Sequence, residues 1–418
     1  MLRLHVRWMA RIAALAAIVI FAEPTSVNAG LPLGVMQRVT SGETPAQQNS
    51  FGFYAAMSGT TCLVSAPLED VGGNVDQGAV YVFNQEPTGK WNLSSRLLDP
   101  NGAANAYMGQ RIRIVGSKAY ITQDASTDSM HAAGSVLEYS NSGGTWTFQR
   151  RLLANGTPDT TIIGGNLDAT STYLFVGGLL LNQNPNGTAV FVFKWNPFTS
   201  QWVQTQMLTP PTPSNRCFGL GGVRITSSYA LVGDCDPIAD HHGVVYEYTL
   251  QGGQWQLSST ITGNPSNAND GFGEDIDLLN DRAFISAPTR SEGGYVFTFR
   301  RQSGIWTQEP FLIGGDSDVG PYGAFGISLS AHSTTNGGVG MASVLIAAPG
   351  AGIWQAAYEG AAYLFTDDGT DTWTQVRKIY FKPLQPPMFA GVVTLGNDTA
   401  FIGNYQSFDD FGYFATTP

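Results

Sequence analysis

The amino-acid sequence predicts an all-β protein made of seven repeated four-stranded units, on three observations. Glycine accounts for 50 of the 418 residues, whereas charged residues make up only 13%. This composition is typical of short strands joined by tight turns. A Phe-Gly pair or a near match recurs at steps of 57, 55, 55, 54, 53 and 65 residues. Each copy is followed by the same succession of apolar and alternating segments, which indicates equal units packed side by side.

The elements of one unit follow in a constant order. The Phe-Gly position occupies Phe51-Gly52, Met108-Gly109, Ile163-Gly164, Phe218-Gly219, Phe272-Gly273, Phe325-Gly326 and Ala390-Gly391. An apolar burst such as "CLVSAP" or "AFISAP" comes next, and then a glycine with alternating bulky residues, as in "GAVYVF" or "GGYVFTF". A tryptophan marks the last, polar segment in six units, at Trp91, Trp146, Trp202, Trp255, Trp306 and Trp373. The period-2 alternation predicts four strands per unit.

Seven four-stranded units predict a seven-bladed β-propeller of antiparallel blades, over residues 30–418. The blades start near residues 51, 108, 163, 218, 272, 325 and 390. We expect the six tryptophans to pack between neighbouring blades. The seventh unit ends at "FGYFATTP" without a tryptophan or a fourth strand. Residues near Val35 to Thr40 align with the missing segment, so they are predicted to close the last blade as its outer strand.

The first 29 residues have the pattern of a secretory signal peptide. Arg3, Arg7 and Arg11 precede the apolar run Ile12 to Ala22, and "VNA" places small residues at the cleavage position. The run is too short to cross a membrane, so we expect a secreted, periplasmic or cell-surface monomer without a membrane span. Loss of residues 1–29 moves the net charge from −11 to −13. That charge argues against nucleic acid as a partner.

Three cysteines are present, and two of them bracket a predicted hairpin. Cys217 precedes a Phe-Gly pair and Cys235 ends the next apolar burst, so a turn near Thr226 to Ser228 would place the two sulfurs opposite each other. A disulfide there would contribute about 3 kcal/mol; the alternative is two free thiols. Cys62 lies within "TTCLVSAP" and is expected to be a small buried apolar residue.

These units resemble the FG-GAP repeat family, whose members include the seven-bladed head of integrin α subunits. The resemblance rests on Phe51-Gly52 with Ser65-Ala66-Pro67, Phe272-Gly273 with Ser286-Ala287-Pro288, and Phe325-Gly326 with Ala347-Ala348-Pro349. It implies a binding or adhesion module. Many members also carry a calcium loop, but hairpins such as "MSGTT" and "LNDR" lack its carboxylates. Asp275, Asp277 and Asp281 come closest, and no cofactor is therefore expected.

Candidate ligand residues fall in loops on one expected face of the propeller. That face collects an acidic rim, made of Glu69, Asp70, Asp76, Asp128, Asp234, Asp236, Asp240, Asp270, Asp316 and Asp318. The rim could bind cations or a basic ligand, or its members could serve only as turn formers. His241 and His242 beside Asp234, Asp236 and Asp240 offer mixed ligands for a transition metal, and the alternative is a solvated loop. Trp354 and Tyr358 could stack on a sugar or anchor a protein, or could pack within their loop.

The sequence favours an exported binding or adhesion module that recognises an extracellular protein or glycan. A propeller-fold polysaccharide hydrolase or lyase and a structural scaffold without a small ligand are the alternatives. No Gly-x-Ser-x-Gly, His-Glu-x-x-His or phosphate-binding loop occurs in the sequence. A catalytic site would bring several carboxylates or arginines together in the central funnel, whereas adhesion would use a broad surface with aromatic residues at its rim.

Overall fold

The structure, a computed structural model, describes most of the chain after the first 35 residues. The described residues are 36–42, 49–124, 134–155, 161–180, 187–211, 217–235, 242–267, 270–315, 323–336, 339–351, 360–367, 372–380, 390–397, 399–403 and 411–416. The predicted signal peptide thus lies outside them. Over these residues, no helix is long and apolar enough to cross a membrane.

The described chain forms seven antiparallel sheets of four strands each, which confirms the predicted fold. Blades 1 to 4 contain β2 (Ala55–Ser58), β3 (Thr61–Ala66), β4 (Ala79–Gln85), β5 (Trp91–Leu97), β6 (Ile112–Val115), β7 (Lys118–Gln123), β8 (Ser135–Ser142), β9 (Thr145–Leu152), β10 (Thr161–Ala169), β11 (Tyr173–Leu180), β12 (Gly187–Asn196), β13 (Gln201–Leu208), β14 (Val223–Ile225), β15 (Tyr229–Asp234), β16 (Val244–Gln251) and β17 (Gln254–Ile261). Blades 5 to 7 contain β18 (Ile276–Leu279), β19 (Arg282–Ala287), β20 (Tyr295–Gln302), β21 (Ile305–Gln308), β22 (Leu329–Asn336), β23 (Val339–Ala348), β24 (Ala361–Asp367), β25 (Trp373–Tyr380), β26 (Val392–Leu395), β27 (Thr399–Gly403), β28 (Phe411–Thr416) and β1 (Met36–Thr40).

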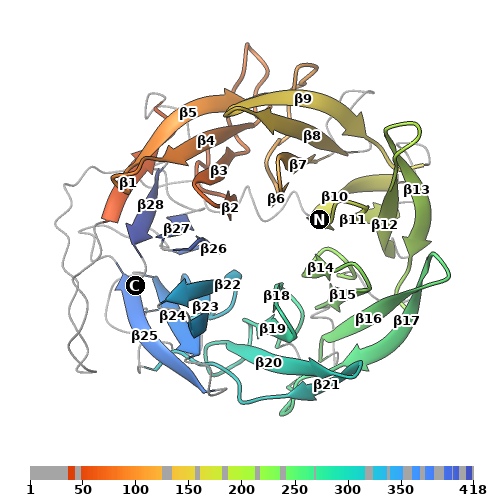
Figure 1. Ribbon diagram of the computed structural model, residues 1–418, viewed down its shortest axis with the longest axis vertical. Helices are drawn as coiled ribbons and strands as arrows, with labels where there is room; N and C mark the ends of the chain where they lie inside the picture. The colour runs from red at the N-terminus through yellow and green to blue at the C-terminus, as the bar shows by residue number, and fades with distance from the viewer. Residues whose placement is uncertain are drawn as a thin grey trace.

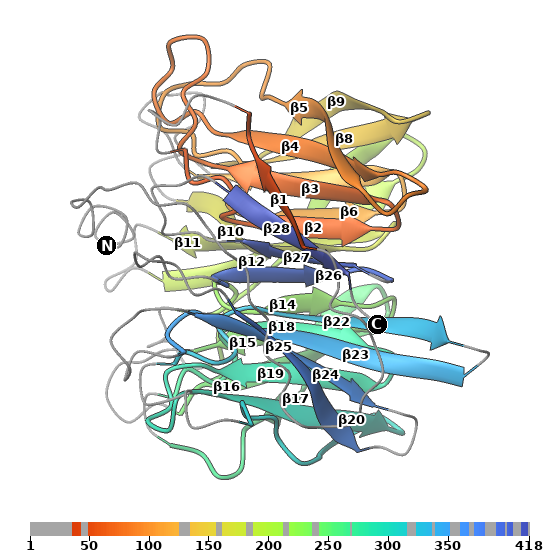
Figure 2. The ribbon, with the colours of Figure 1, turned by 90° about the vertical axis from the view of Figure 1, so that its left-hand side faces the viewer.

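The sheets stand around a common axis like the blades of a propeller (Figure 1). The first strand of each blade lies nearest the axis, and the fourth lies at the rim. The inner strands are β2, β6, β10, β14, β18, β22 and β26. They begin on one face of the ring, here called the loop-bearing face, because the connections between blades and those between second and third strands both lie there (Figure 2).

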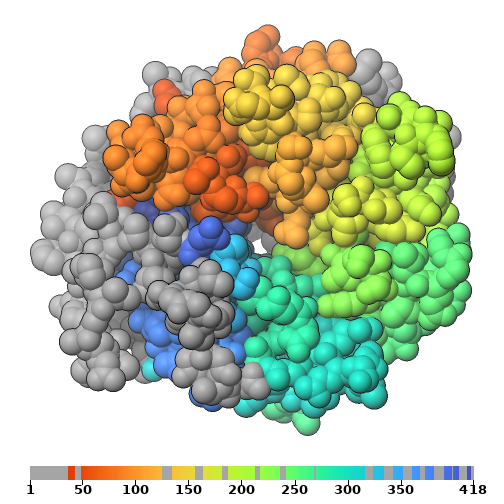
Figure 3. Space-filling model, viewed as in Figure 1, coloured from red at the N-terminus to blue at the C-terminus, as the bar shows by residue number. Residues whose placement is uncertain are grey.

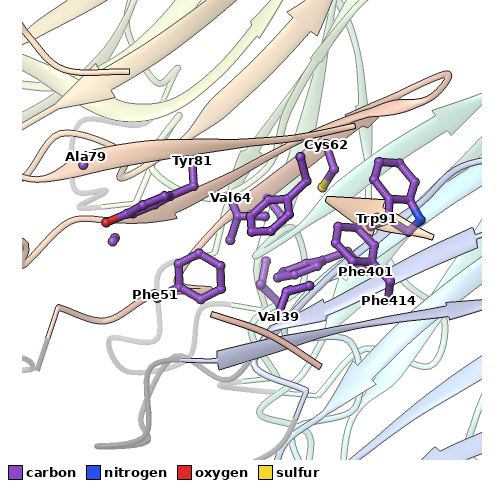
Figure 4. Close-up of a cluster of buried hydrophobic side chains, with 13 residues drawn as sticks. Val39, Phe51, Cys62, Val64, Ala79, Tyr81, Trp91, Phe401 and Phe414 are labelled. Atoms are coloured by element: carbon purple, nitrogen blue, oxygen red, sulfur yellow. The ribbon is translucent and has the colours of Figure 1, made fainter. Parts of the chain in front are cut away.

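The apolar core lies between blades. The second strand of a blade is buried almost throughout, as β3 and β15 are, whereas an outer strand such as β13 alternates between exposed and half-buried residues. Each apolar cluster joins two adjacent blades. Figure 4 shows the cluster between blades 7 and 1, which contains Phe51, Trp91 and Phe414. One blade therefore cannot bury its apolar faces without its neighbours.

The N-terminal strand closes the ring, as the sequence predicts. β1 pairs with β28 in a register that runs from Met36 opposite Ala415 to Thr40 opposite Phe411. The side chain of Gln37 then binds the backbone of blade 1: its Oε1 accepts the Trp91 N–H at 2.8 Å, and its Nε2 donates to the Trp91 carbonyl. The last blade thus contains the first and the last described strands of the chain.

The tryptophans pack against the preceding blade, which confirms their predicted role. Trp91 stacks on Phe414 with ring centroids 4.3 Å apart and an interplanar angle of 7°. Four others make edge contacts: Trp202 with Tyr120, Trp255 with Phe175, Trp306 with Tyr229 and Trp373 with Phe284. Trp146 packs on the cluster shared by blades 1 and 2.

The Phe-Gly motif has a backbone reason. The phenylalanine is fully buried in blades 1, 4 and 6, and the glycine that follows has a positive φ, for example +92° at Gly52 and +93° at Gly273. A Cβ on Gly273 would lie 3.2 Å from a Val245 methyl and 3.3 Å from the Gly233 Cα of the preceding blade. Glycine meets both demands, because it adopts positive φ without strain and lets two blades approach closely.

A disulfide joins Cys217 and Cys235, as predicted. Their Cα atoms are 5.5 Å apart, and the β14–β15 hairpin turns between Ile225 and Tyr229. Cys62 is fully buried, which agrees with its expected role as a small apolar residue.

We expect Trp91→Ala to lower the free energy of unfolding by about 3–5 kcal/mol, because it removes a 2%-exposed ring at the junction that closes the propeller. Urea unfolding followed by fluorescence measures the change. Trp306→Ala is the control. The Trp306 indole is only half-buried, at the interface between blades 4 and 5, so its removal should cost less. Equal costs would contradict the conclusion that the near-complete burial of Trp91 at the closing junction sets its cost.

We expect a non-reducing peptide map of the purified protein to recover Cys217 and Cys235 in one linked peptide pair. Reduction should lower the free energy of unfolding by about 3 kcal/mol, the cost of releasing a loop of this length. Recovery of both residues as alkylated thiols without a reductant would disprove the bridge.

Candidate functional site

Polar side chains of the inner strands gather around the propeller axis in two rings. The rings are defined from the pairing of the first and second strands in each blade. One inner-strand residue per blade occupies the equivalent place in that pairing: Ala55, Ile112, Leu167, Val223, Ile276, Leu329 and Val393. The preceding residues form the upper ring, nearer the loop-bearing face: Tyr54, Arg111, Asn166, Gly222, Asp275, Ser328 and Val392. The following residues form the lower ring: Ala56, Arg113, Asp168, Arg224, Asp277, Ser330 and Thr394.

The charges of the lower ring alternate and pair with one another. The Arg113 Nε lies 2.6 Å from an Asp168 carboxylate oxygen, and the Arg224 Nε lies 2.8 Å from an Asp277 oxygen. Burial acts to lower the pKa of Arg224, but Asp277 and the other carboxylates around it raise that pKa above its ordinary value. These four side chains thus form two compensated ion pairs, each between neighbouring blades.

The carboxylates of the lower ring also bind the backbone of the next inner strand. Asp168 accepts the Ile225 N–H and Asp277 accepts the Ala331 N–H, both at 2.8 Å. An inner strand has no partner strand on its axial side, so its N–H groups there need another acceptor. The lower ring therefore holds the blades together, and its charged groups are already satisfied.

Asp275, in the upper ring, has a similar structural role. One carboxylate oxygen accepts the Leu329 N–H of blade 6 at 2.9 Å, and the other accepts the Ile276 N–H. Arg224 lies 3.9 Å away. Burial raises the pKa of Asp275 to about 6, against the opposing effect of the Arg224 charge.

Tyr54 and Arg111 form a cationic and aromatic side of the upper ring. The Arg111 guanidinium carbon lies 5.2 Å from the centre of the Tyr54 ring. Burial raises the pKa of the Tyr54 hydroxyl, while the charges of Arg224 and Arg111 oppose that rise. Both residues are half-buried, so water and a ligand can reach them.

Glu274 lies just above Asp275, against the disulfide of blade 4. Its carboxylate and the sulfurs of Cys217 and Cys235 lie within 4.8 Å of one another. The sulfurs are bonded to each other, so this trio is not a metal site. Burial raises the pKa of Glu274, and Arg111 opposes the rise. Within the described residues, its carboxylate makes no hydrogen bond or ion pair.

Asn166 provides a second acceptor without a partner. Its side chain is 5% exposed, and its Oδ1 has no hydrogen-bond partner in the described part of the chain. An unpaired buried amide oxygen costs about 1–3 kcal/mol, so such an atom calls for an explanation. In the next blade the equivalent position is Gly222, which has no side chain to offer.

Three described members of the predicted acidic rim have partners within the protein. Glu69 is buried and binds the Tyr81 hydroxyl and Arg96. Asp70 accepts the Asp76 N–H at 2.9 Å. Asp270 accepts the Phe272 N–H and lies 3.7 Å from Arg290. These contacts fit the turn-forming alternative stated for the rim.

The structure describes only some of the other predicted ligand residues. Asp234 is 1% exposed at the end of β15, and His242 is exposed before β16. Asp277 and Asp275, considered above for calcium, bind arginine and backbone groups instead. The remaining predicted residues lie outside the described chain: Asp128, Asp236, Asp240, His241, Asp316, Asp318, Trp354 and Tyr358.

The axial residues Tyr54, Arg111, Asn166, Arg224 and Glu274 were not predicted as a site. The sequence does contain a signal for them, because most upper-ring residues stand two positions after the motif glycine and most lower-ring residues stand four. Charged residues at these two offsets are unusual in a chain with 13% charge. Blade 4 hides the pattern, since it has one extra residue before Val223.

We expect Asp275→Asn to remove a pH-dependent part of the stability. Because the pKa of Asp275 is raised to about 6, its contribution to the free energy of unfolding is present below pH 3.8 and is lost as the pH rises through 6. Asn keeps an acceptor for Leu329, so the variant should gain stability relative to the wild type between pH 4 and 8, by at most about 3 kcal/mol. Urea unfolding at several pH values tests this; parallel curves would contradict it.

Comparison with known proteins supports the fold and the repeat. The FG-GAP repeat model matches residues 39–83, which run from β1 through the first three strands of blade 1. No curated protein matches the sequence. Among solved structures, similar folds include two provisionally named 6-phosphogluconolactonases, one from Bacteroides fragilis NCTC 9343 and one from Bacteroides uniformis ATCC 8492.

Both of these structures share the fold at low sequence identity. The first is 15% identical with a TM-score of 0.51, and the alignment covers 83% of this chain and 88% of the other. The second is 12% identical with a TM-score of 0.50, over 77% and 84% of the two chains. Similarity at this level shows the architecture and not the activity. The chain thus carries an FG-GAP repeat, at residues 39–83, within a seven-bladed β-propeller.

Proposed function

We propose that this protein is an exported binding module that recognises an extracellular glycan through its loop-bearing face. One observation carries the proposal: polar groups from blades 1, 2, 3 and 5 lie around the axis on that face, and two of their acceptors, the buried Asn166 Oδ1 and the half-buried Glu274 carboxylate, have no partner within the described residues. Unpaired donors and acceptors beside an aromatic ring suit a hydroxylated ligand, whose OH groups both donate and accept. The acidic composition also suits neutral or cationic ligands.

A polysaccharide hydrolase or lyase is the second candidate, because carboxylates and arginines do converge at the axis. The details favour binding. Glu274 and Asp275 are neighbours in sequence and point away from each other, one toward the disulfide of blade 4 and the other toward blade 6. Glycoside hydrolysis uses two carboxyl groups that face each other across the scissile bond. Asp168 and Asp277 are bound to arginine and backbone groups.

The provisional lactonase names of the two similar structures do not extend this proposal. At 15% and 12% identity they share the fold with this chain. A propeller supports many unrelated functions, so the ligand has to be argued from the side chains of this protein.

We expect residues 30–418 to bind at least one class of glycan on a glycan array, and Arg111→Ala to weaken that binding at least tenfold. Trp354→Ala and Tyr358→Ala should also weaken it, since aromatic side chains on this face were predicted to stack on sugars. Phe198→Ala is the matched control: Phe198 is 98% exposed and lies in the β12–β13 hairpin, on the opposite face.

A protein pull-down with the same material separates the alternatives. Capture of one protein without glycan binding would replace the glycan by a protein partner. Turnover of a polysaccharide that is lost in Asp275→Asn would favour the enzyme. Absence of any ligand would leave the scaffold.

A further inference from the structure

The geometry points to a carboxylate-binding subsite at Arg111, in the upper ring of the propeller axis, where the guanidinium binds the carboxylate of an acidic sugar. This inference rests on the proposed glycan-binding function and names the chemical class of one sugar in the ligand. It is argued from the hydrogen bonds of Arg111, from the two other arginines of the rings, and from the aromatic side chain beside Arg111.

The backbone of Arg111 and one end of its side chain are held by neighbouring groups. Its N–H donates to the Thr122 hydroxyl at 3.0 Å, and its carbonyl accepts the Thr122 N–H at 3.0 Å. Its Nη1 donates to the Gln110 carbonyl at 2.8 Å. Within the described residues, its Nε and Nη2 have no acceptor and its guanidinium makes no ion pair. The edge formed by Nε and Nη2, which can hold both oxygens of a carboxylate, is therefore open to a ligand.

The other two arginines of the rings show what binds at this edge. Arg224 has the same arrangement as Arg111, because its Nη1 also donates to the carbonyl of the preceding residue at 2.8 Å. Its Nε donates to an oxygen of Asp277, in the next blade, at 2.8 Å. The Nε of Arg113 likewise lies 2.6 Å from an oxygen of Asp168, in the blade that follows it. Each of these arginines thus has a carboxylate at its Nε.

The next blade offers Arg111 no carboxylate at the equivalent position. Asp168 and Asp277 stand one blade after their arginines, at the same place on the inner strand. The residue at that place after Arg111 is Asn166, which carries no charge. A carboxylate on the ligand would give Arg111 the partner that the other two arginines receive from the protein.

Arg111 can be reached by a ligand. It is half-buried, whereas Arg224 is only 8% exposed. It belongs to the upper ring, so the shorter approach to it is from the loop-bearing face. Figure 3 shows the opposite face, where the ring is hollowed at its centre. From that side a ligand would first meet the lower ring, whose charges are already paired.

The aromatic neighbour of Arg111 favours a sugar as the carrier of the carboxylate. Tyr54, whose ring centre lies 5.2 Å from the Arg111 guanidinium carbon, is half-buried, and its hydroxyl makes no hydrogen bond within the described residues. Burial raises the pKa of this hydroxyl, so it stays protonated and can donate to a sugar oxygen. A uronic acid has hydroxyl groups next to its carboxylate that can use this donor, whereas a peptide chain end does not.

The net charge of −13 after loss of residues 1–29 favours a ligand with few negative charges. A polyanion would be repelled by the protein as a whole. A single carboxylate at Arg111 instead meets a local positive charge, since salt at physiological concentration screens exposed charges more than about 8 Å away. We therefore expect the acidic sugar to be one unit of a largely neutral glycan.

The test is isothermal titration calorimetry of residues 30–418 with cello- and xylo-oligosaccharides that carry one glucuronic acid unit, and with their uncharged methyl esters. We expect the acids to bind about tenfold or more tightly than the esters, because the esters lose a charge-assisted, bidentate contact. Arg111→Gln should remove this preference. Arg300→Gln is the control, since Arg300 is a half-buried arginine on the third strand of blade 5, and its Nε lies 3.0 Å from Glu309.

The comparison of acid with ester separates ligand recognition from folding. A poorly folded variant would lose affinity for both probes, whereas loss of the carboxylate contact lowers the affinity for the acid alone. Arg111→Lys keeps the charge but not the paired N–H groups, so it should retain only part of the preference. Circular dichroism and melting curves of each variant verify that it is folded.

The outcomes distinguish this inference from the proposed function. Equal affinity for acid and ester, a preference that survives Arg111→Gln, or no binding of these probes would overturn the subsite, and any glycan bound on the array would leave the glycan-binding function standing. A peptide with a free C-terminal carboxylate and its amide are titrated alongside. Binding of that peptide in place of the acidic oligosaccharides, lost in its amide and in Arg111→Gln, would replace the sugar by a protein chain end. No binding of any glycan would overturn both.

Discussion

Each blade of this propeller exposes the edge of its inner strand toward the axis, and the rest of the structure depends on how that edge is satisfied. Side chains of the preceding blade supply the acceptors: Asp168 for blade 4, Asp275 and Asp277 for blade 6, and Ser330 for blade 7. The same side chains fix the spacing between blades. Their charges are therefore part of the architecture, and an axial carboxylate alone is no sign of a ligand.

Blade 4 departs from this pattern. It has an extra residue between Gly219 and Val223, and its upper-ring position is a glycine. The disulfide holds the beginning of the blade to the end of β15, so the altered segment is fixed in place. Asn166 in the blade before it has an amide oxygen without a partner in the described part of the chain.

The fold could be predicted from the sequence because its main signals are local. The Phe-Gly pair is required by a buried aromatic ring followed by a residue of positive φ, and Trp91 is required by its contact with the neighbouring blade. The axial site could not be predicted in the same way, because which carboxylates find partners depends on contacts between residues about 55 positions apart, as between Arg224 and Asp277. The acidic rim has the same limit, because the sequence does not distinguish a ligand residue from one such as Glu69 or Asp270, which has partners inside the protein.

The number of hydrogen-bond and ion-pair partners of each axial group shows which groups are still available to bind a ligand. Asp277 has an arginine and a backbone N–H, and removing either would leave a buried charge without compensation. Glu274 has neither, although burial raises its pKa in the same way as that of Asp275. A half-buried carboxylate without a partner in the protein adds nothing to stability. Glu274 is half-buried, so water or a ligand can supply the donors that its carboxylate lacks within the described residues, whereas its better-paired neighbours are already satisfied.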